Sequence, residues 1–147
     1  MLFRSNNALR GSATSNLTIG SGAAAGILFF RNSGTNNYMK DLRFLSNASA
    51  TLGNRLNITP GAAAGRVIVA SNSSLASNGN LILKSDTLGT AYVDEIAGCT
   101  TCTPITGEVE VERAMPNRRT WRLVTIPVTG NYTLRQQLTR QIGRAHV

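Results

Sequence analysis

The chain has 147 residues, a formal net charge of +8, 15% charged residues and 5% aromatic residues. This length allows one domain with a buried core. The abundance of Gly, Ala, Ser, Thr and Asn between short Leu, Ile and Val clusters predicts an all-β chain with many turns. The positive charges form no basic run and are not interleaved with aromatic residues, which argues against a nucleic-acid surface. No apolar run approaches the length of a membrane span, so none is predicted.

Short apolar triplets recur along residues 17–93 and predict a series of short strands. In each triplet the first and third residues lie on one face of a strand, and the middle residue lies on the other. The starts of successive triplets are 10 to 14 residues apart. The triplets are Leu17–Ile19, Leu28–Phe30, Leu42–Phe44, Leu56–Ile58, Val67–Val69, Leu81–Leu83 and Ala91–Val93.

Two consecutive intervals sum to roughly 25 residues, a repeat length typical of solenoids. We therefore predict a right-handed parallel β-helix, or β-solenoid, with a β-sandwich as the alternative fold. The very short strands and the repeated interval favour the solenoid. Arg43 and Asn57 are expected to be exposed. Leu81→Asp is expected to be far more damaging than Ile82→Asp, because only Leu81 faces the proposed core. The predicted core consists of Leu17, Ile19, Leu42, Phe44, Leu56, Ile58, Val67, Val69, Leu81 and Leu83.

Residues 15–30 and 54–69 align without gaps over sixteen positions, which indicates an internal repeat. Three glycines of the first copy, followed by Asp41, imitate the fingerprint of a dinucleotide-binding fold. These glycines are Gly20, Gly22 and Gly26. The second copy has Thr59 in place of the first glycine, and a Gly- and Asn-rich stretch interrupts the helix that such a fold needs. We predict no bound cofactor.

Cys99 and Cys102 form a CTTC sequence within a predicted loop. A redox pair of this spacing needs a βαβ context, and a zinc site needs a second pair of ligands. Both are missing, so the pair is a candidate local disulfide of an exported protein, and no metal site is predicted. The predicted organisation is solenoid coils in 1–98, a loop in 99–106, a strand pair in 107–130, a continuation in 131–141 and a tail in 142–147.

The strand pair predicted in residues 107–130 begins with three glutamates that alternate with two valines over 108–112. The glutamates therefore share one strand face and the valines share the other. A turn around Pro116 and the strand-like TWRLVTIPV follow, which predicts a hairpin-like unit whose arginines pair with the glutamates. Neither a calcium loop nor a catalytic carboxylate pair has this spacing, so no catalytic residue is predicted here.

The segment ITGEVEVERAMPNRRTWRLVTIPVTG resembles a junction found in large exported surface proteins of Bacteroidota, many of which carry a C-terminal sorting domain for the type IX secretion system. The residues that carry the resemblance are Glu112, Arg113, Pro116, Arg119, Trp121, Arg122, Pro127 and Val128. The upstream LILKSDTLGTAYV is similar to the step that precedes this junction in the family. The resemblance covers roughly residues 40–130. It implies an extracellular or outer-membrane-surface location and specifies no activity.

The last six residues, IGRAHV, resemble a translated sequencing adapter, so we expect the natural sequence to end near Gln141 and the chain to be a fragment of a longer protein. The single histidine, His146, belongs to that tail, which removes the obvious general base for a Ser/His or Cys/His arrangement. We expect a non-catalytic structural or adhesive β-solenoid segment of a large secreted or cell-surface protein. Its candidate partner is extracellular polysaccharide or cell-surface matrix. The alternative is part of a β-helical polysaccharide-degrading enzyme or a carbohydrate-binding module.

Overall fold

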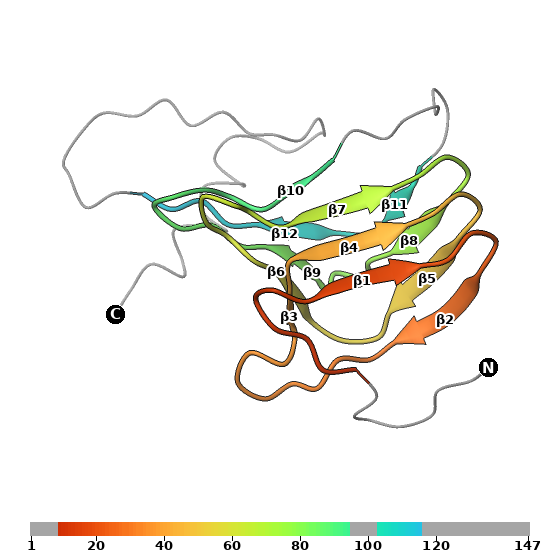
Figure 1. The fold of residues 1–147 in the computed structure, drawn as a ribbon, viewed down its shortest axis with the longest axis horizontal. Helices are drawn as coiled ribbons and strands as arrows, with labels where there is room; N and C mark the ends of the chain where they lie inside the picture. Colours follow the sequence, from red (N-terminus) through yellow and green to blue (C-terminus); the bar gives the residue numbers. More distant parts are fainter. Residues whose placement is uncertain (1–8, 95–102, 116–147) are drawn as a thin grey trace. The chain divides into compact units, whose positions relative to one another are not determined.

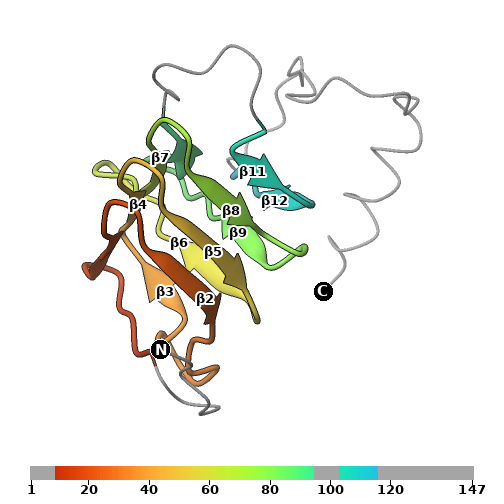
Figure 2. The ribbon, with the colours of Figure 1, turned by 90° about the vertical axis from the view of Figure 1, so that its right-hand side faces the viewer.

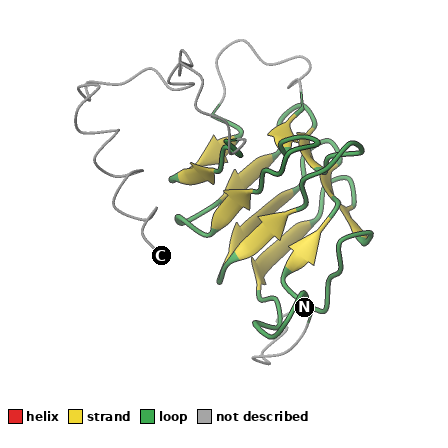
Figure 3. Cartoon of the chain, turned by 90° about the vertical axis from the view of Figure 1, so that its left-hand side faces the viewer, coloured by secondary structure: helices red, strands yellow, loops and turns green. Residues whose placement is uncertain are grey.

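The computed structural model describes residues 9–94 and 103–115, which consist of short strands joined by turns and loops, without a helix (Figures 1 and 3). This described part of the chain therefore contains no helix that could cross a membrane. The strands are β1 (Asn16–Ile19), β2 (Ala24–Leu28), β3 (Tyr38–Met39), β4 (Asp41–Phe44), β5 (Ser49–Leu52), β6 (Leu56–Ile58), β7 (Arg66–Val69), β8 (Ser74–Ala76), β9 (Leu81–Leu83), β10 (Tyr92–Val93), β11 (Ile105–Thr106) and β12 (Val109–Val111).

The strands form three parallel sheets of four strands each. Sheet 1 has the order β1-β4-β7-β10, sheet 2 has β2-β5-β8-β11 and sheet 3 has β3-β6-β9-β12. Each coil of the chain thus contributes one strand to every sheet, and the next coil stacks on it (Figure 2). All neighbouring strands within these sheets are parallel. The predicted parallel β-solenoid is confirmed, and the alternative β-sandwich, which is built from antiparallel sheets, is wrong.

Most paired strands of successive coils are 25 residues apart, whereas the steps from β3 to β6, from β9 to β12 and from β8 to β11 are 19, 28 and 30 residues. Asn16 lies beside Asp41, and Asp41 lies beside Arg66, so sheet 1 repeats every 25 residues. Leu56 lies beside Leu81, which gives the same step in sheet 3. The interval inferred from the apolar triplets is therefore the length of one coil. The sixteen-residue alignment of 15–30 with 54–69 is not the coil repeat, because it matches β1 with β6, which belong to different sheets.

The inward-facing residues of successive strands form one hydrophobic core. Leu42, Phe44, Leu56, Ile58 and Val67 are fully buried. The remaining predicted core residues are buried as well, except Leu17, which is partly buried and packs against the cluster at the first coil. Period-two alternation of apolar residues therefore identified the inward face of sheets 1 and 3.

Sheet 2 was largely missed by the search for apolar triplets. Its strand β5 has the sequence SATL and β8 has SLA, in which small residues interrupt the apolar pattern. The expected triplet Leu28–Phe30 is wrong as a strand, because β2 ends at Leu28. The backbone of Phe30 instead bonds the side-chain amide of Asn54, with its N–H donating to Oδ1 at 2.8 Å and its carbonyl accepting from Nδ2 at 2.5 Å. The side chain of Asn54 thus replaces a neighbouring strand.

The outer side of sheet 3 corrects two expectations about exposure. Asn57 and Ile82, the outward residues of β6 and β9, are only 5% and 1% exposed, although both were expected to face solvent. Ile82 is not part of the inner core cluster, so it is buried on the outer side of the sheet. The guanidinium of Arg55 pairs with the carboxylate of Glu110 at 3.8 Å, and Glu110 lies beside Ile82 in register. This ion pair therefore crosses β9 on the outer side next to Ile82. Arg43 is exposed, as predicted.

The corner between sheets 1 and 2 has a left-handed backbone conformation in three successive coils. Gly22, Asn47 and Asn72 occupy this corner with φ angles of 68°, 62° and 58°. Glycine and asparagine are the residues that adopt positive φ most readily. The Gly- and Asn-rich composition of the chain is therefore explained by tight corners that repeat with the coil.

The solenoid continues past residue 98, where the coils were expected to end. Strand β11, which lies within the expected 99–106 loop, pairs with β8 of sheet 2, and β12 pairs with β9 of sheet 3. Val109 and Val111 face the core, whereas Glu110 is exposed, so the predicted alternation of glutamates and valines is confirmed for these three residues. The expected hairpin partner of this strand, TWRLVTIPV, lies outside the described residues.

Candidate functional site

Most of the residues singled out in the sequence lie outside the described ranges. These are Cys99, Cys102, Pro116, Arg119, Trp121, Arg122, Pro127 and Val128. The two described members of the junction motif are Glu112 and Arg113. The carboxylate of Glu112 forms an ion pair with the ammonium group of Lys84, and Arg113 is exposed. Glu112 is thus engaged in a contact between neighbouring coils.

The two sequence segments that carry the family resemblance meet at the end of β9. The backbone N–H of Glu112 donates to the carbonyl of Leu83 at 2.9 Å, and that of Ala114 donates to the Ser85 hydroxyl at 3.0 Å. The Ser85 hydroxyl is also 2.6 Å from the hydroxyl of Thr90. Residues 84–90 and 112–114 therefore form one structural junction, in which the side chains of Lys84, Ser85 and Glu112 have partners within the junction.

The outer face of sheet 1 carries the largest set of exposed polar side chains that successive coils bring together. One row across this face consists of Asn16, Asp41, Arg66 and Tyr92, which are neighbours in register on β1, β4, β7 and β10. The Asn16 Oδ1 accepts a hydrogen bond from the backbone N–H of Asp41 at 3.2 Å. Neighbouring strands are about 4.8 Å apart, so the row spans roughly 14 Å along the solenoid axis.

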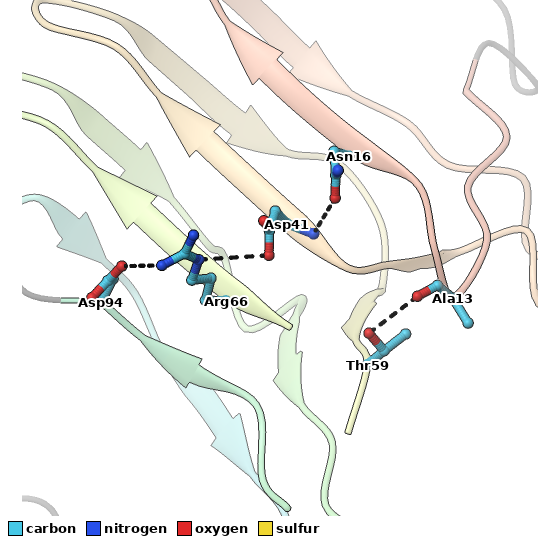
Figure 4. A network of polar contacts seen from close by, with 6 residues as sticks. All are labelled: Ala13, Asn16, Asp41, Thr59, Arg66 and Asp94. Atoms are coloured by element: carbon cyan, nitrogen blue, oxygen red, sulfur yellow. Dashed lines mark hydrogen bonds and ion pairs between the residues drawn. The ribbon is translucent and has the colours of Figure 1, made fainter. Parts of the chain in front are cut away.

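Arg66 is the electrostatic centre of this row (Figure 4). Its Nη1 donates to the Asp94 carboxylate at 3.0 Å, and its Nε lies 3.8 Å from the Asp41 carboxylate. Partial desolvation opposes the guanidinium charge, but the attraction of Asp41 and Asp94 and the contact with Tyr92 outweigh it. The pKa of Arg66 is therefore raised above its ordinary value. The guanidinium is held in a fixed orientation between two carboxylates.

A second row on the same face contains Thr18, Arg43 and Ile68, again in register. Arg43 is exposed, and among residues 9–94 and 103–115 its side chain takes part in no ion pair or hydrogen bond. The ring of Tyr92 in the first row is 45% exposed. The face thus combines a cation available to a ligand, an accessible aromatic ring and an oriented set of hydrogen-bonding groups.

The outer faces of the other two sheets present fewer groups that could contact a ligand. The outward positions of sheet 2 hold Ile27, which is 54% exposed, and small residues such as Ser49, Thr51 and Ser74. Those of sheet 3 include the buried Asn57 and Ile82. In the part of the chain that the structure describes, no three His, Cys, Asp or Glu side chains are grouped so that they could hold a metal ion. Sheet 1 is therefore the candidate binding face.

The carboxylates on this face were missed in the sequence. Only the middle residues of the apolar triplets were taken as outward, and none of them is acidic. Asp41 and Asp94 flank the triplets instead, two residues before Arg43 and two residues after Tyr92, so they point outward by the same alternation. Extending each triplet by one residue would have placed both on the outer face.

Comparison with known proteins gives no relative for this chain: no family model, no curated protein and no solved structure matches it.

Proposed function

We propose that this chain is a non-catalytic structural or adhesive β-solenoid segment of a large secreted or cell-surface protein. The observation that carries the proposal is the stacking of four coils in register around one continuous apolar core. Such an array extends by adding coils, which suits a spacer or a long binding surface. The resemblance of residues 40–130 to exported Bacteroidota surface proteins supports an extracellular or outer-membrane-surface location.

The adhesive part of the proposal assigns binding to the outer face of sheet 1. Extended parallel sheets present side chains at regular intervals, so a polymer with a repeating unit can contact several coils at once. Hydroxyl groups of a polysaccharide match the donors of Arg66 and the acceptors of Asp41 and Asp94, and a sugar ring can pack on Tyr92. The partner class proposed is extracellular polysaccharide.

A second function is favoured by one observation. Asp41 and Asp94 lie on either side of Arg66 on an exposed sheet face, and polysaccharide-degrading enzymes use carboxylates as acid, base or nucleophile. The alternative is therefore a β-helical polysaccharide-degrading enzyme that uses this face. In the present arrangement both carboxylates contact the same guanidinium, which favours a structural use of the pair.

Binding and turnover by the full chain distinguish the two functions. The chain is incubated with soluble and insoluble polysaccharides, and the bound fraction and the new reducing or unsaturated ends are measured in the same samples. We expect retention on at least one polysaccharide without any new ends. Release of new ends that is lost in Asp41→Asn would refute the non-catalytic function. If the chain is retained on none of the polysaccharides and forms no product, the adhesive role is refuted.

A further inference from the structure

The outer face of sheet 1 has one charged side chain that is not engaged by the fold. Asp41 and Asp94 both pair with Arg66, which uses the carboxylates that could otherwise neutralise a neighbouring cation. Arg43, in the adjacent row of β4, has no ion-pair or hydrogen-bond partner in the described residues. Its guanidinium therefore presents its donors to the solvent in the middle of a four-stranded sheet.

We propose that this face binds an acidic polysaccharide, with Arg43 pairing with a uronate carboxylate and Tyr92 contacting a sugar ring further along the chain. A guanidinium binds a carboxylate through two parallel hydrogen bonds, which a sugar hydroxyl cannot reproduce. This inference rests on the proposed adhesive function, because it names the ligand class of the same face.

The positions of the two residues fit a polymer that runs across the strands. Arg43 lies on β4 and Tyr92 on β10, with β7 between them. The two side chains are therefore separated by two strand spacings, roughly 10 Å along the axis, so they contact different units of one chain. Ile68, beside Arg43 in register, provides a partly buried apolar surface between them.

The net charge of the molecule favours the same class of ligand. The chain carries a formal charge of +8 at pH 7, of which the described residues contribute only +2, so this charge attracts a polyanion to the chain as a whole and does not direct it to sheet 1. This general attraction weakens as salt is added, whereas a bidentate pair at one guanidinium adds a contribution that depends on a single residue. The two contributions can therefore be separated by mutation.

The test uses the full 147-residue chain and polygalacturonate as the probe, with fully methyl-esterified polygalacturonate as a neutral polymer of the same backbone. Dissociation constants are measured by titration calorimetry or affinity electrophoresis for the wild type, Arg43→Gln, Tyr92→Ala and Arg113→Gln. Arg113 is also exposed but lies after β12 of sheet 3 and in no strand of sheet 1, so its variant removes one charge without changing a strand of that face. Melting curves check that each variant is folded.

We expect Arg43→Gln to weaken binding of polygalacturonate about tenfold or more, as the loss of a charged hydrogen-bonded pair requires. Tyr92→Ala should weaken it several-fold, and Arg113→Gln less than about twofold. Equal losses for Arg43→Gln and Arg113→Gln would overturn the inference, because binding would then depend on total charge alone. Equal affinity for the esterified polymer would also overturn it.

The outcome for this inference is separable from the outcome for the proposed function. Retention of the chain on neutral polysaccharides but not on polygalacturonate would reject the acidic ligand and leave an adhesive solenoid. Formation of new ends from either polymer would reject the non-catalytic function itself.

Discussion

Replacing Gly107 by alanine tests how closely the last described coil packs on the preceding coil at this corner. Gly107 lies between β11 and β12 with φ of 88°, a conformation that costs an alanine about 1 kcal/mol. A Cβ atom at this position would lie 2.7 Å from the Ser77 hydroxyl oxygen and 2.9 Å from the backbone nitrogen of Asn78. Both distances are shorter than a van der Waals contact, so the corner must shift as well.

The Ser77 hydroxyl has little freedom to move away. Ser77 is fully buried, and its hydroxyl lies 2.9 Å from the Thr106 carbonyl and 2.8 Å from the Glu108 carbonyl. Overpacking of this kind costs about 1–3 kcal/mol. Together with the backbone cost, we expect Gly107→Ala to lower the free energy of unfolding by about 3 kcal/mol. With a slope of about 2 kcal/mol per M, the urea midpoint falls by roughly 1.5 M.

Gly79→Ala is the matched control. Gly79 also has a positive φ, of 72°, but a Cβ atom there meets no atom within 4 Å. Only the backbone cost of about 1 kcal/mol remains, which lowers the urea midpoint by roughly 0.5 M. Far-UV circular dichroism of both variants in urea measures the difference. Equal midpoints for Gly79→Ala and Gly107→Ala would refute the tight contact between Ser77 and the corner of the next coil.

Three further predictions follow from burial and pairing. Leu81→Asp and Ile82→Asp should both lower the free energy of unfolding by several kcal/mol, because each places a charge in a buried site. An unchanged melting temperature for Ile82→Asp would contradict the burial of Ile82 on the outer side of sheet 3. Lys84→Met should lower the free energy of unfolding, measured in urea, by about 1 kcal/mol, and adding Glu112→Gln to this variant should lower it little further. If the losses of the two single variants add up in the double variant, the two side chains do not act as a pair. Removal of residues 142–147, which resemble a translated sequencing adapter, should leave the melting temperature unchanged, and a clear decrease would contradict this expectation.

The inward face of the solenoid could be predicted from the sequence because its signal is local. In β4 and β7 two apolar residues flank a single outward residue, and the same pattern returns one coil later. Both the strand and the coil length follow from that alternation. The strands of sheet 2 could not be predicted in this way, because small residues fill part of the core there. Ala50 is buried beside Leu75, and no apolar triplet marks the strand.

The surroundings of outward residues could not be predicted in the same way. Asn57 and Ile82 alternate correctly, yet both are buried. Arg55, directly before β6, and Glu110 of β12 pair with each other although they lie two coils apart. Such contacts depend on which coils become neighbours in space. The same limit applies to the candidate site, because Arg66 and its partners Asp41 and Asp94 lie on three different coils and meet only when these coils are stacked.

The structural junction has two halves, residues 84–90 and 112–114, which bond to each other. Lys84 pairs with Glu112, and Ser85 accepts a hydrogen bond from the backbone of Ala114, so each half supplies partners that the other half needs. Asp86 completes the arrangement by accepting hydrogen bonds from the backbone N–H groups of Leu88 and Gly89 at 2.8 and 2.9 Å. These polar groups bind one another, which leaves them little capacity for a ligand. A search for ligand contacts is therefore directed to the outer face of sheet 1, where Arg43 and Tyr92 remain accessible.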